Sequence, residues 1–414
     1  MKHNALLVLL LLSGICIFAQ NKSVSESPHL FEHDYPVIAT ENPIIRALMD
    51  SVSIDSIEAT ITHLCSYQNR RCDSRHIYDV QDWLAARYNS LEGLDTVMLH
   101  DFEVEKEGFP EETADNILAI QWGLTKPEEY VICGAHYDSW NGDTADPDTV
   151  RAPGADDNAT GVAGIWETAR LLSRYKFHRT IIYCNWCAEE IGLIGSEAYA
   201  KECAEKRMDI VGYFNMDMNG YLKEGTDIHM HVVYVNQDSL LANMFFDVCH
   251  TYFPDMPVRQ NWMPHGDSDF SSFNRSGYPA LHPFEDVHAS SPYIHTRQDV
   301  LGLSVNNLEQ SKRFAEINLA AVAHLAGLTD VSVTESEACA VAVYPNPARE
   351  SVNILAEVGL QQVTIYNLLG QQMETKNPKG KNRCVINTND YPSGIYLVHL
   401  ATENGVAMKR LVVE

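Results

Sequence analysis

The chain has 414 residues, a formal net charge of −26 and 45% hydrophobic residues. Its length exceeds that of one typical domain, so we expect two domains of ordinary globular composition. The acidic balance repels phosphate backbones, which argues against a nucleic-acid partner.

The N-terminus predicts a secretory signal peptide over residues 1–19. Lys2 supplies positive charge, Ala5–Leu12 forms a short apolar core, and cleavage is expected after Ala19. Lipoprotein processing at Cys16 is the disfavoured alternative, because a bulky residue precedes that cysteine. No run is long enough to predict a transmembrane segment in the mature chain.

Export permits disulfides, and the cysteine spacing suggests one. Cys65 and Cys72 flank a short polar loop and are the predicted pair. Cys184 and Cys187 have CxxC spacing. They lie at the end of a strand rather than at the start of a helix, so we do not expect a redox motif there.

Residues 43–328 alternate helical and strand-like patterns. The spacing of apolar residues predicts two helices between Pro43 and Tyr88. The strands predicted beyond them are 129–135, 180–186, 210–216 and 279–284, and the helices are 161–175, 196–204, 239–252 and 305–325. This alternation predicts an α/β domain with a mainly parallel, mixed sheet and helices on both faces.

The composition changes after Leu328. Residues 329–340 are predicted to form a polar linker. Residues 341–414 contain short β-rich runs separated by turn signals such as Asn346-Pro347 and Asn404-Gly405. They predict a small antiparallel β-sandwich domain.

Imidazole and carboxylate side chains follow three of the predicted strands. Ligands of an open parallel sheet bind beyond the carboxyl ends of its strands, so these side chains are expected to converge. The candidates are His136, Asp157, Glu189, Glu190, Asp217 and His295. Two adjacent cations need a bridging carboxylate, and mixed imidazole and carboxylate ligands suit zinc. A remaining carboxylate can accept a proton from bound water, so the set predicts a two-zinc hydrolase.

Each candidate also has an ordinary structural interpretation. Glu189 and Glu190 suit the first turn of an exposed helix, and Asp157 suits a turn or a helix cap. A single histidine is more often a core residue than a ligand. The joint occurrence of all six residues favours the metal site.

Six motifs together make the family resemblance specific: GAHYDS, PGADDNATG, AEEIGLIGS, NMDM, SGYPA and IHTRQD. Residues 43–328 resemble the co-catalytic two-zinc exopeptidases of the bacterial leucyl aminopeptidase type, a family that includes glutaminyl cyclases. The resemblance implies one zinc ion held by His136 and Asp217 and a second held by Glu190 and His295. Asp157 would bridge the two ions.

The same resemblance implies roles for the neighbouring residues. Glu189 would be the general acid/base, and Asp138 would orient the ring of His136. A cis peptide bond is implied between Asp157 and Asn158. Three apolar neighbours of the inferred ligands are predicted to line a pocket for the substrate side chain: Met218, Phe284 and Ile294.

The function predicted from these residues is a secreted zinc aminopeptidase acting on peptide substrates. A glutaminyl cyclase, which is an acyltransferase, and a related carboxypeptidase are alternatives within the same fold. A non-catalytic surface binding protein is a third alternative. The presence of Glu189 and Asp157 disfavours it, because such a protein would be expected to lose the base or the bridge.

His229 and His231 are two residues apart and so share one face of a strand. An extra metal site is one interpretation of this pair. An ordinary polar strand face is the favoured one, because no third ligand lies nearby in the sequence.

The C-terminal runs YPNPARESVNI, VTIYNLLGQQM, YPSGIYLVHL and MKRLVVE resemble the sorting domain of the type IX secretion system. The resemblance implies the type IX machinery as a partner and a route through the periplasm to the cell surface or the medium. A carbohydrate-binding or merely stabilising sandwich is the alternative. No cluster of aromatic residues supports sugar binding.

Overall fold

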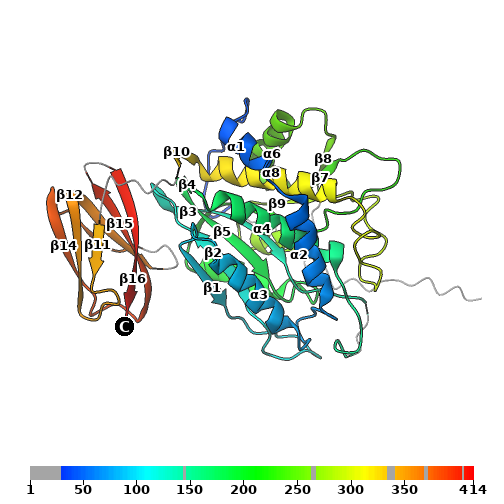
Figure 1. The fold of residues 1–414 in the computed structure, drawn as a ribbon, viewed down its shortest axis with the longest axis horizontal. Coiled ribbons are helices and arrows are strands. Elements are labelled where there is room, and N and C mark those ends of the chain that lie inside the picture. Colours follow the sequence, from blue (N-terminus) through cyan, green and yellow to red (C-terminus); the bar gives the residue numbers. More distant parts are fainter. Residues whose placement is uncertain (1–28, 143–145, 263–266, 333–340, 368–371, 403–404) are drawn as a thin grey trace, which may run out of the picture.

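The computed structural model describes residues 29–142, 146–262, 267–332, 341–367, 372–402 and 405–414. The predicted signal peptide and most of the predicted linker lie outside these residues. The described chain forms a large α/β part and a smaller all-β part beside it (Figure 1).

An eight-stranded sheet forms the centre of the α/β part. Its strand order is β1-β2-β5-β3-β6-β9-β7-β8. The pairs β3–β5, β3–β6, β6–β9 and β7–β8 are parallel, whereas β1–β2, β2–β5 and β7–β9 are antiparallel. The strands are β1 (Thr96–His100), β2 (Asn116–Gln121), β3 (Lys126–His136), β5 (Arg179–Trp186), β6 (Asp209–Asn215), β7 (Met230–Tyr234), β8 (Val258–Trp262) and β9 (Ala280–Phe284). The predicted α/β fold with a mixed, mainly parallel sheet is confirmed.

Strand β3 shows why the central strands are apolar along their whole length. Tyr130 and Ile132 belong to the hydrophobic cluster on one face of the sheet, and Val131 and Cys133 belong to the cluster on the other. Because both faces are covered by helices, neither set of alternating side chains meets water.

Helices cover the two faces in separate groups. Helices α4 and α8 pack directly on β3 and β5, with α1 and α2 against them, while α5 and α7 contribute to the cluster on the opposite face. The helices are α1 (Pro43–Met49), α2 (Ile54–Ser66), α3 (Ile77–Asn89), α4 (Thr160–Leu172), α5 (Ile194–Glu205), α6 (Ser239–Tyr252), α7 (Phe270–Arg275) and α8 (Leu308–Ala326). Two short helical segments are η1 (Ala155–Ala159) and η2 (Asn236–Asp238).

Local signals set several helix ends. The side chain of Asn42 accepts hydrogen bonds from the backbone of α1, and the Asn307 side chain accepts one from Gln310 at the start of α8. Gly327 ends α8 in the left-handed conformation, which glycine adopts without a steric penalty. These caps satisfy backbone groups that a helix end leaves unpaired.

The structure extends the α/β part slightly beyond the predicted boundary. Helix α4 ends at Leu172, before the predicted end at Tyr175, because residues Tyr175–Phe177 form strand β4. Strand β4 pairs with β10 (Leu328–Ser332), so the first residues of the predicted linker are a strand.

The C-terminal part is antiparallel throughout. Its strands are β11 (Val341–Tyr344), β12 (Ser351–Asn367), β13 (Gln372–Lys376), β14 (Lys381–Asn387), β15 (Gly394–Thr402) and β16 (Gly405–Val413). The long strand β12 pairs with β11 and β14 in its first half and with β13 and β15 in its second. Buried residues from both halves, including Ile354 and Ile365, share one apolar core. The predicted all-β domain is confirmed.

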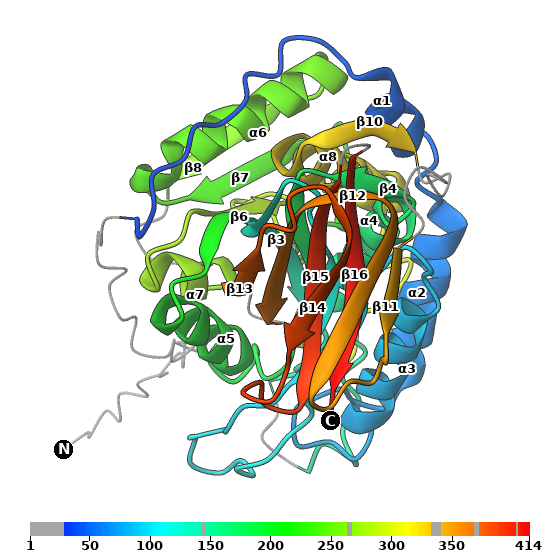
Figure 2. The same cartoon turned by 90° about the vertical axis from the view of Figure 1, so that its left-hand side faces the viewer.

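The two parts touch at the end of the sheet where β3 begins. Leu397, Tyr366 and Met408 pack on the cluster that contains Trp122 and Tyr130. The His399 ring lies 2.9 Å from the carbonyl oxygen of Leu124. Figure 2 shows the C-terminal strands in front of the α/β part. Within the described residues, no helix is long and apolar enough to cross a membrane.

Candidate metal centre

The predicted ligands converge at the carboxyl edge of the sheet. His136 ends β3, Glu189 and Glu190 follow β5, and Asp217 follows β6. Because β5, β3 and β6 are adjacent and parallel, their ends meet at one edge. Segment η1 brings Asp157 to this edge, and the loop beyond β9 brings the sixth candidate, His295.

Asp157 lies between the two histidines. Its Oδ1 is 3.2 Å from Nε2 of His136, and its Oδ2 is 3.0 Å from Nε2 of His295. Asp217 Oδ1 lies 3.5 Å from His136 Nε2, and Glu190 Oε2 lies 3.0 Å from His295 Nε2. Two groups of side chains therefore share one carboxylate. The peptide bond from Asp157 to Asn158 is cis, as the family resemblance implies.

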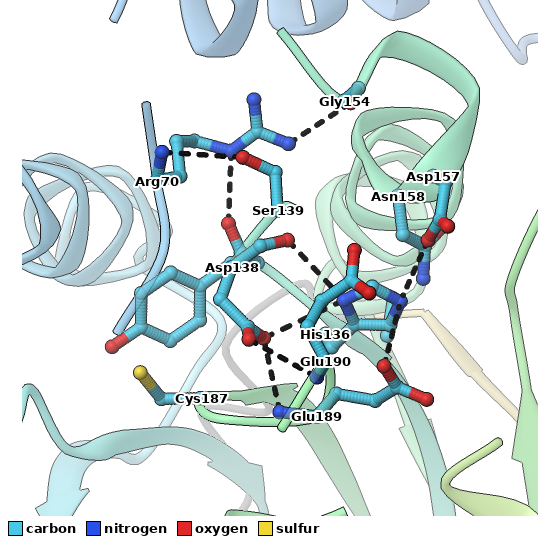
Figure 3. Close-up of polar contacts among 12 residues, drawn as sticks. Arg70, His136, Asp138, Ser139, Gly154, Asp157, Asn158, Cys187, Glu189 and Glu190 are labelled. Carbon is cyan, nitrogen blue, oxygen red and sulfur yellow. Dashed lines mark hydrogen bonds and ion pairs between the residues drawn. The ribbon is translucent and has the colours of Figure 1, made fainter. Parts of the chain in front are cut away.

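Asp138 connects His136 with the pair of glutamates. Its Oδ1 is 3.5 Å from Nδ1 of His136. The same carboxylate accepts hydrogen bonds from the backbone N–H groups of Glu189 and Glu190, both at 3.2 Å (Figure 3). One fully buried carboxylate thus fixes an imidazole ring and the turn that carries both glutamates.

Arg70 braces the same site from the segment that follows α2. Its buried guanidinium donates to the carbonyl oxygens of Tyr137 and Gly154, each at 2.9 Å (Figure 3). It also donates to the carbonyl oxygen of Pro153. These carbonyls belong to the loop that follows His136 and to the loop that precedes Asp157. The planar guanidinium offers several donors at fixed angles, so it sets the spacing of the two loops.

Asp299 holds the backbone of η1. Its two carboxylate oxygens accept hydrogen bonds from the N–H groups of Asp156 at 2.8 Å and Asp157 at 3.1 Å. Burial raises the pKa of Asp299 to about 6. Sequence reasoning missed the roles of Arg70 and Asp299, although Asp299 is the last residue of the IHTRQD motif.

The cluster shifts the pKa values of its own members. Interaction with Glu190 and then with Asp157 raises the pKa of His295 to about 12. Burial alone would lower the pKa of His136, but Glu189 and Asp217 raise it well above its usual value. Burial and the charge of Asp157 raise the pKa of Glu190 to about 7. The clustered carboxylates therefore favour positive charge at the centre of the site. Without metal ions, protons on the two histidines supply that charge.

Unpaired ligand atoms test whether the residues fit metal ions. His136 Nε2, Glu190 Oε1 and Asp217 Oδ1 are buried and make no hydrogen bond within the described residues. Such atoms are costly to bury unless a partner satisfies them. Ligand atoms of His136, Asp157 and Glu190 lie within 4.8 Å of one another, as do those of His136, Glu189 and Asp217. The donor set and its geometry fit divalent metal ions.

Two of the predicted pocket residues are next to a candidate ligand in the sequence, since Met218 follows Asp217 and Ile294 precedes His295. Met218 is buried with a positive φ of 53°, whereas Phe284 and Ile294 are half-buried. The ring of Phe284 lies 5.2 Å from that of His282. That these three side chains line one substrate pocket stays a prediction.

The predicted disulfide between Cys65 and Cys72 is wrong, because both are free thiols, as are all cysteines of the described chain. The two side chains have different surroundings. Cys65 interacts with Arg70 and Asp299, whereas Cys72 is buried near Cys187. A short separation in sequence did not bring the two thiols together.

Comparison with known proteins agrees with this geometry. Residues 116–322 match peptidase family M28, and residues 342–414 match a secretion system C-terminal sorting domain. A probable aminopeptidase of Saccharomyces cerevisiae is 25% identical over 286 residues, covering 67% of this chain and 74% of its own. Leucine aminopeptidase 1 of Trichophyton equinum is 27% identical and covers 64% and 73%.

Solved structures share the fold. The LapA aminopeptidase of Legionella pneumophila is 26% identical with a TM-score of 0.61, over 72% of this chain and 78% of its own. A glutaminyl cyclase of Porphyromonas gingivalis has a TM-score of 0.52 at 17% identity over 66% and 98%, which shows a shared fold alone. The sorting domain at residues 342–414 implies export by the type IX system to the outer surface or the medium. The chain therefore belongs to peptidase family M28 and is a metallo-exopeptidase.

Proposed function

We propose that this protein is a secreted aminopeptidase that uses two zinc ions to remove single residues from the free N-termini of peptides. One observation carries the proposal: the two carboxylate oxygens of Asp157 face His136 and His295 on opposite sides. A carboxylate in that position suits a bridge between two cations.

The ligand assignment follows from the two groups around that bridge. His136 and Asp217 would hold one ion, and Glu190 and His295 would hold the other. Imidazole and carboxylate ligands suit zinc. A structure of the same fold is described as a zinc aminopeptidase from Bacillus subtilis. When bound, the ions supply Lewis acidity that activates a water molecule near neutral pH.

Glu189 is the proposed general acid/base. Its Oε2 lies 3.8 Å from His136 Nε2, beside the ligands, and burial raises its pKa well above the usual range. A carboxylate in this place takes a proton from the attacking water and passes it to the leaving amine. Asp138 contacts both the Glu189 backbone and the His136 ring. It therefore fixes the position of the proton acceptor, Glu189, relative to the metal ligand, His136.

The proposed route begins with the predicted signal peptide and passage into the periplasm. The sorting domain then directs the folded enzyme to the type IX machinery. His399 and the β-domain lie at the amino end of β3, away from the carboxyl edge that bears His136. The peptidase site would therefore remain open to peptides while the sorting domain is engaged.

A comparison of three peptides tests the activity. The purified full chain, loaded with zinc, is incubated with Leu-Gly-Gly, its N-acetylated form, and a peptide that begins with glutamine. We expect release of free leucine from the first peptide and little from the second. Cyclisation of the third without hydrolysis would support a glutaminyl cyclase instead. Release of the C-terminal residue from the acetylated peptide would support a carboxypeptidase.

A further inference from the structure

A second group of metal-type side chains lies outside the peptidase centre. We propose that His229, His231 and Asp286 form a separate site for a divalent transition-metal ion such as zinc. Ligand atoms of these three residues lie within 4.8 Å of one another. The proposal does not rest on the peptidase function, because it uses none of the residues assigned to the first site.

Strand pairing brings the third residue to the two histidines. Strands β7 and β9 are antiparallel, and His231 is the register partner of Phe284. Two residues further along the same register, His229 lies opposite Asp286. Asp286 Oδ2 is 3.1 Å from His229 Nε2, and its Oδ1 is 3.8 Å from His231 Nε2.

His229 is oriented as metal-bound histidines usually are. Its Nδ1 lies 2.8 Å from the carbonyl oxygen of Asp227, so Nδ1 carries the proton and donates it. Its Nε2 then faces the Asp286 carboxylate at 3.1 Å. This contact is favourable when a cation lies between the two atoms, either a proton on Nε2 or a metal ion. A backbone carbonyl on the outer nitrogen of a histidine is a common support for metal ligation.

His231 contributes the second sign of a ligand site. Its side chain is 1% exposed, and its Nε2 makes no hydrogen bond within the described residues. His136 Nε2 in the peptidase centre has the same property. Burial lowers the pKa of His231, because desolvation disfavours a charged ring.

Two neighbouring groups oppose the site only weakly. The backbone N–H of Val287 lies 3.3 Å from Nδ1 of His231, and metal binding through Nε2 would open this long hydrogen bond. Arg259 is the register partner of His231 on β8, but it is exposed, so solvent screens its charge. Asp286 and His229 are 17% and 12% exposed, so an ion can reach the site from solvent.

The chemistry points to zinc or a close neighbour. Two imidazoles and one carboxylate form a typical zinc set and leave a position for water. An ion here would tie the start of β7 to the loop that leaves β9.

Metal stoichiometry tests the proposal. The full chain and the variants Asp286→Asn and His229→Gln are stripped of metal and dialysed against buffered free zinc, and bound zinc is measured by elemental analysis. We expect each variant to bind one zinc ion fewer than the unsubstituted protein. Both variants should keep the peptidase activity, since neither residue belongs to the first site.

Asp227→Asn is the matched control, because Asp227 is exposed, carries the same charge and lies beside the cluster. It should bind as much zinc as the unsubstituted protein. Equal zinc content in all four proteins would overturn the proposal and leave an imidazolium–carboxylate pair. If Asp286→Asn does not fold, His229→Gln decides. The difference of one ion is measured whatever the occupancy of the peptidase centre.

Discussion

The interior of the α/β part near the carboxyl edge differs from the interior of the C-terminal part. The first buries several ionisable side chains, among them Asp138, Asp157, Glu189, Asp217 and Asp299. Among the described residues of the C-terminal part, the buried polar side chains are Thr364 and Thr388, and the rest of the core is apolar.

This difference indicates what each interior is for. Burying charged groups near one another is costly unless partners compensate them, so it rarely serves stability alone. The carboxyl edge keeps such groups because they bind cations and transfer protons. The C-terminal core needs only to fold and present its surface, which apolar packing achieves. Four experiments test this contrast.

The largest effect is expected from Glu189→Gln. The amide has nearly the same shape but cannot accept a proton, so kcat should fall by about 10²- to 10⁴-fold while bound zinc is unchanged. Steady-state kinetics and metal analysis measure the two quantities. Glu205→Gln, an exposed glutamate at the end of α5, is the matched control and should be neutral. Near-normal turnover of Glu189→Gln would remove Glu189 from its proposed role.

Arg70→Met should show how far the ligand loops depend on their brace. The substitution removes the guanidinium hydrogen bonds to the buried carbonyl oxygens of Tyr137, Pro153 and Gly154, so the free energy of unfolding should fall by about 3 kcal/mol. Zinc affinity should fall about 10- to 100-fold, as when a supporting partner is lost. Urea unfolding and competition with a chelator measure these effects.

Arg349→Met provides the surface control for that variant. Arg349 is an arginine of the C-terminal part whose side chain is 79% exposed and lies 3.3 Å from Glu414. An exposed ion pair contributes little, so stability and zinc affinity should be unchanged. If Arg70→Met behaves like Arg349→Met, the guanidinium is not needed to hold the loops.

Ile365→Ala tests whether the apolar core of the C-terminal part contributes stability without affecting catalysis. Ile365 is fully buried in the C-terminal part, so its truncation should destabilise that part by about 3 kcal/mol. Calorimetry should show the loss, while kcat and zinc content remain unchanged. Val385→Ala, at a 43% exposed position of the same part, should have little effect. A fall in zinc content after Ile365→Ala would contradict the separation of the two regions.

Ending the chain after Ser332 should have the smallest effect on catalysis. The proposed ligands all precede this residue, so the shortened enzyme should keep its kcat and its zinc. In a bacterium with the type IX system it should no longer reach the cell surface or the medium, because the sorting domain is missing. Fractionation of cells and medium tests delivery. A soluble, folded but inactive product would mean that the β-domain helps to build the active site.

Much of the architecture could be predicted from the sequence because it depends on local signals. Apolar periodicity identified strands such as 180–186 and the long helix that ends the α/β part. The change in composition after Leu328 predicted a separate β-rich part. The six candidate residues of the metal centre follow strands or sit in motifs, so they could be named before their geometry was known. Their roles at the metal ions stay predictions.

Other features required the tertiary structure, because they depend on residues far apart in the chain. Proximity in sequence predicted a Cys65–Cys72 disulfide, yet the two thiols have different surroundings. Arg70 meets Gly154 only after α2 packs against α4 and η1.

The strand order gives the clearest case. The sequence placed His229 and His231 on one strand face but supplied no third ligand. Asp286 reaches them because β9 pairs with β7 in an antiparallel register, and the chain between these strands contains α6, β8 and α7. Side-chain alternation along a strand is a local property of the backbone, so the sequence determined it. Which strand lies beside which is decided by how the helices and strands pack together, so only the folded chain could bring the third ligand into place.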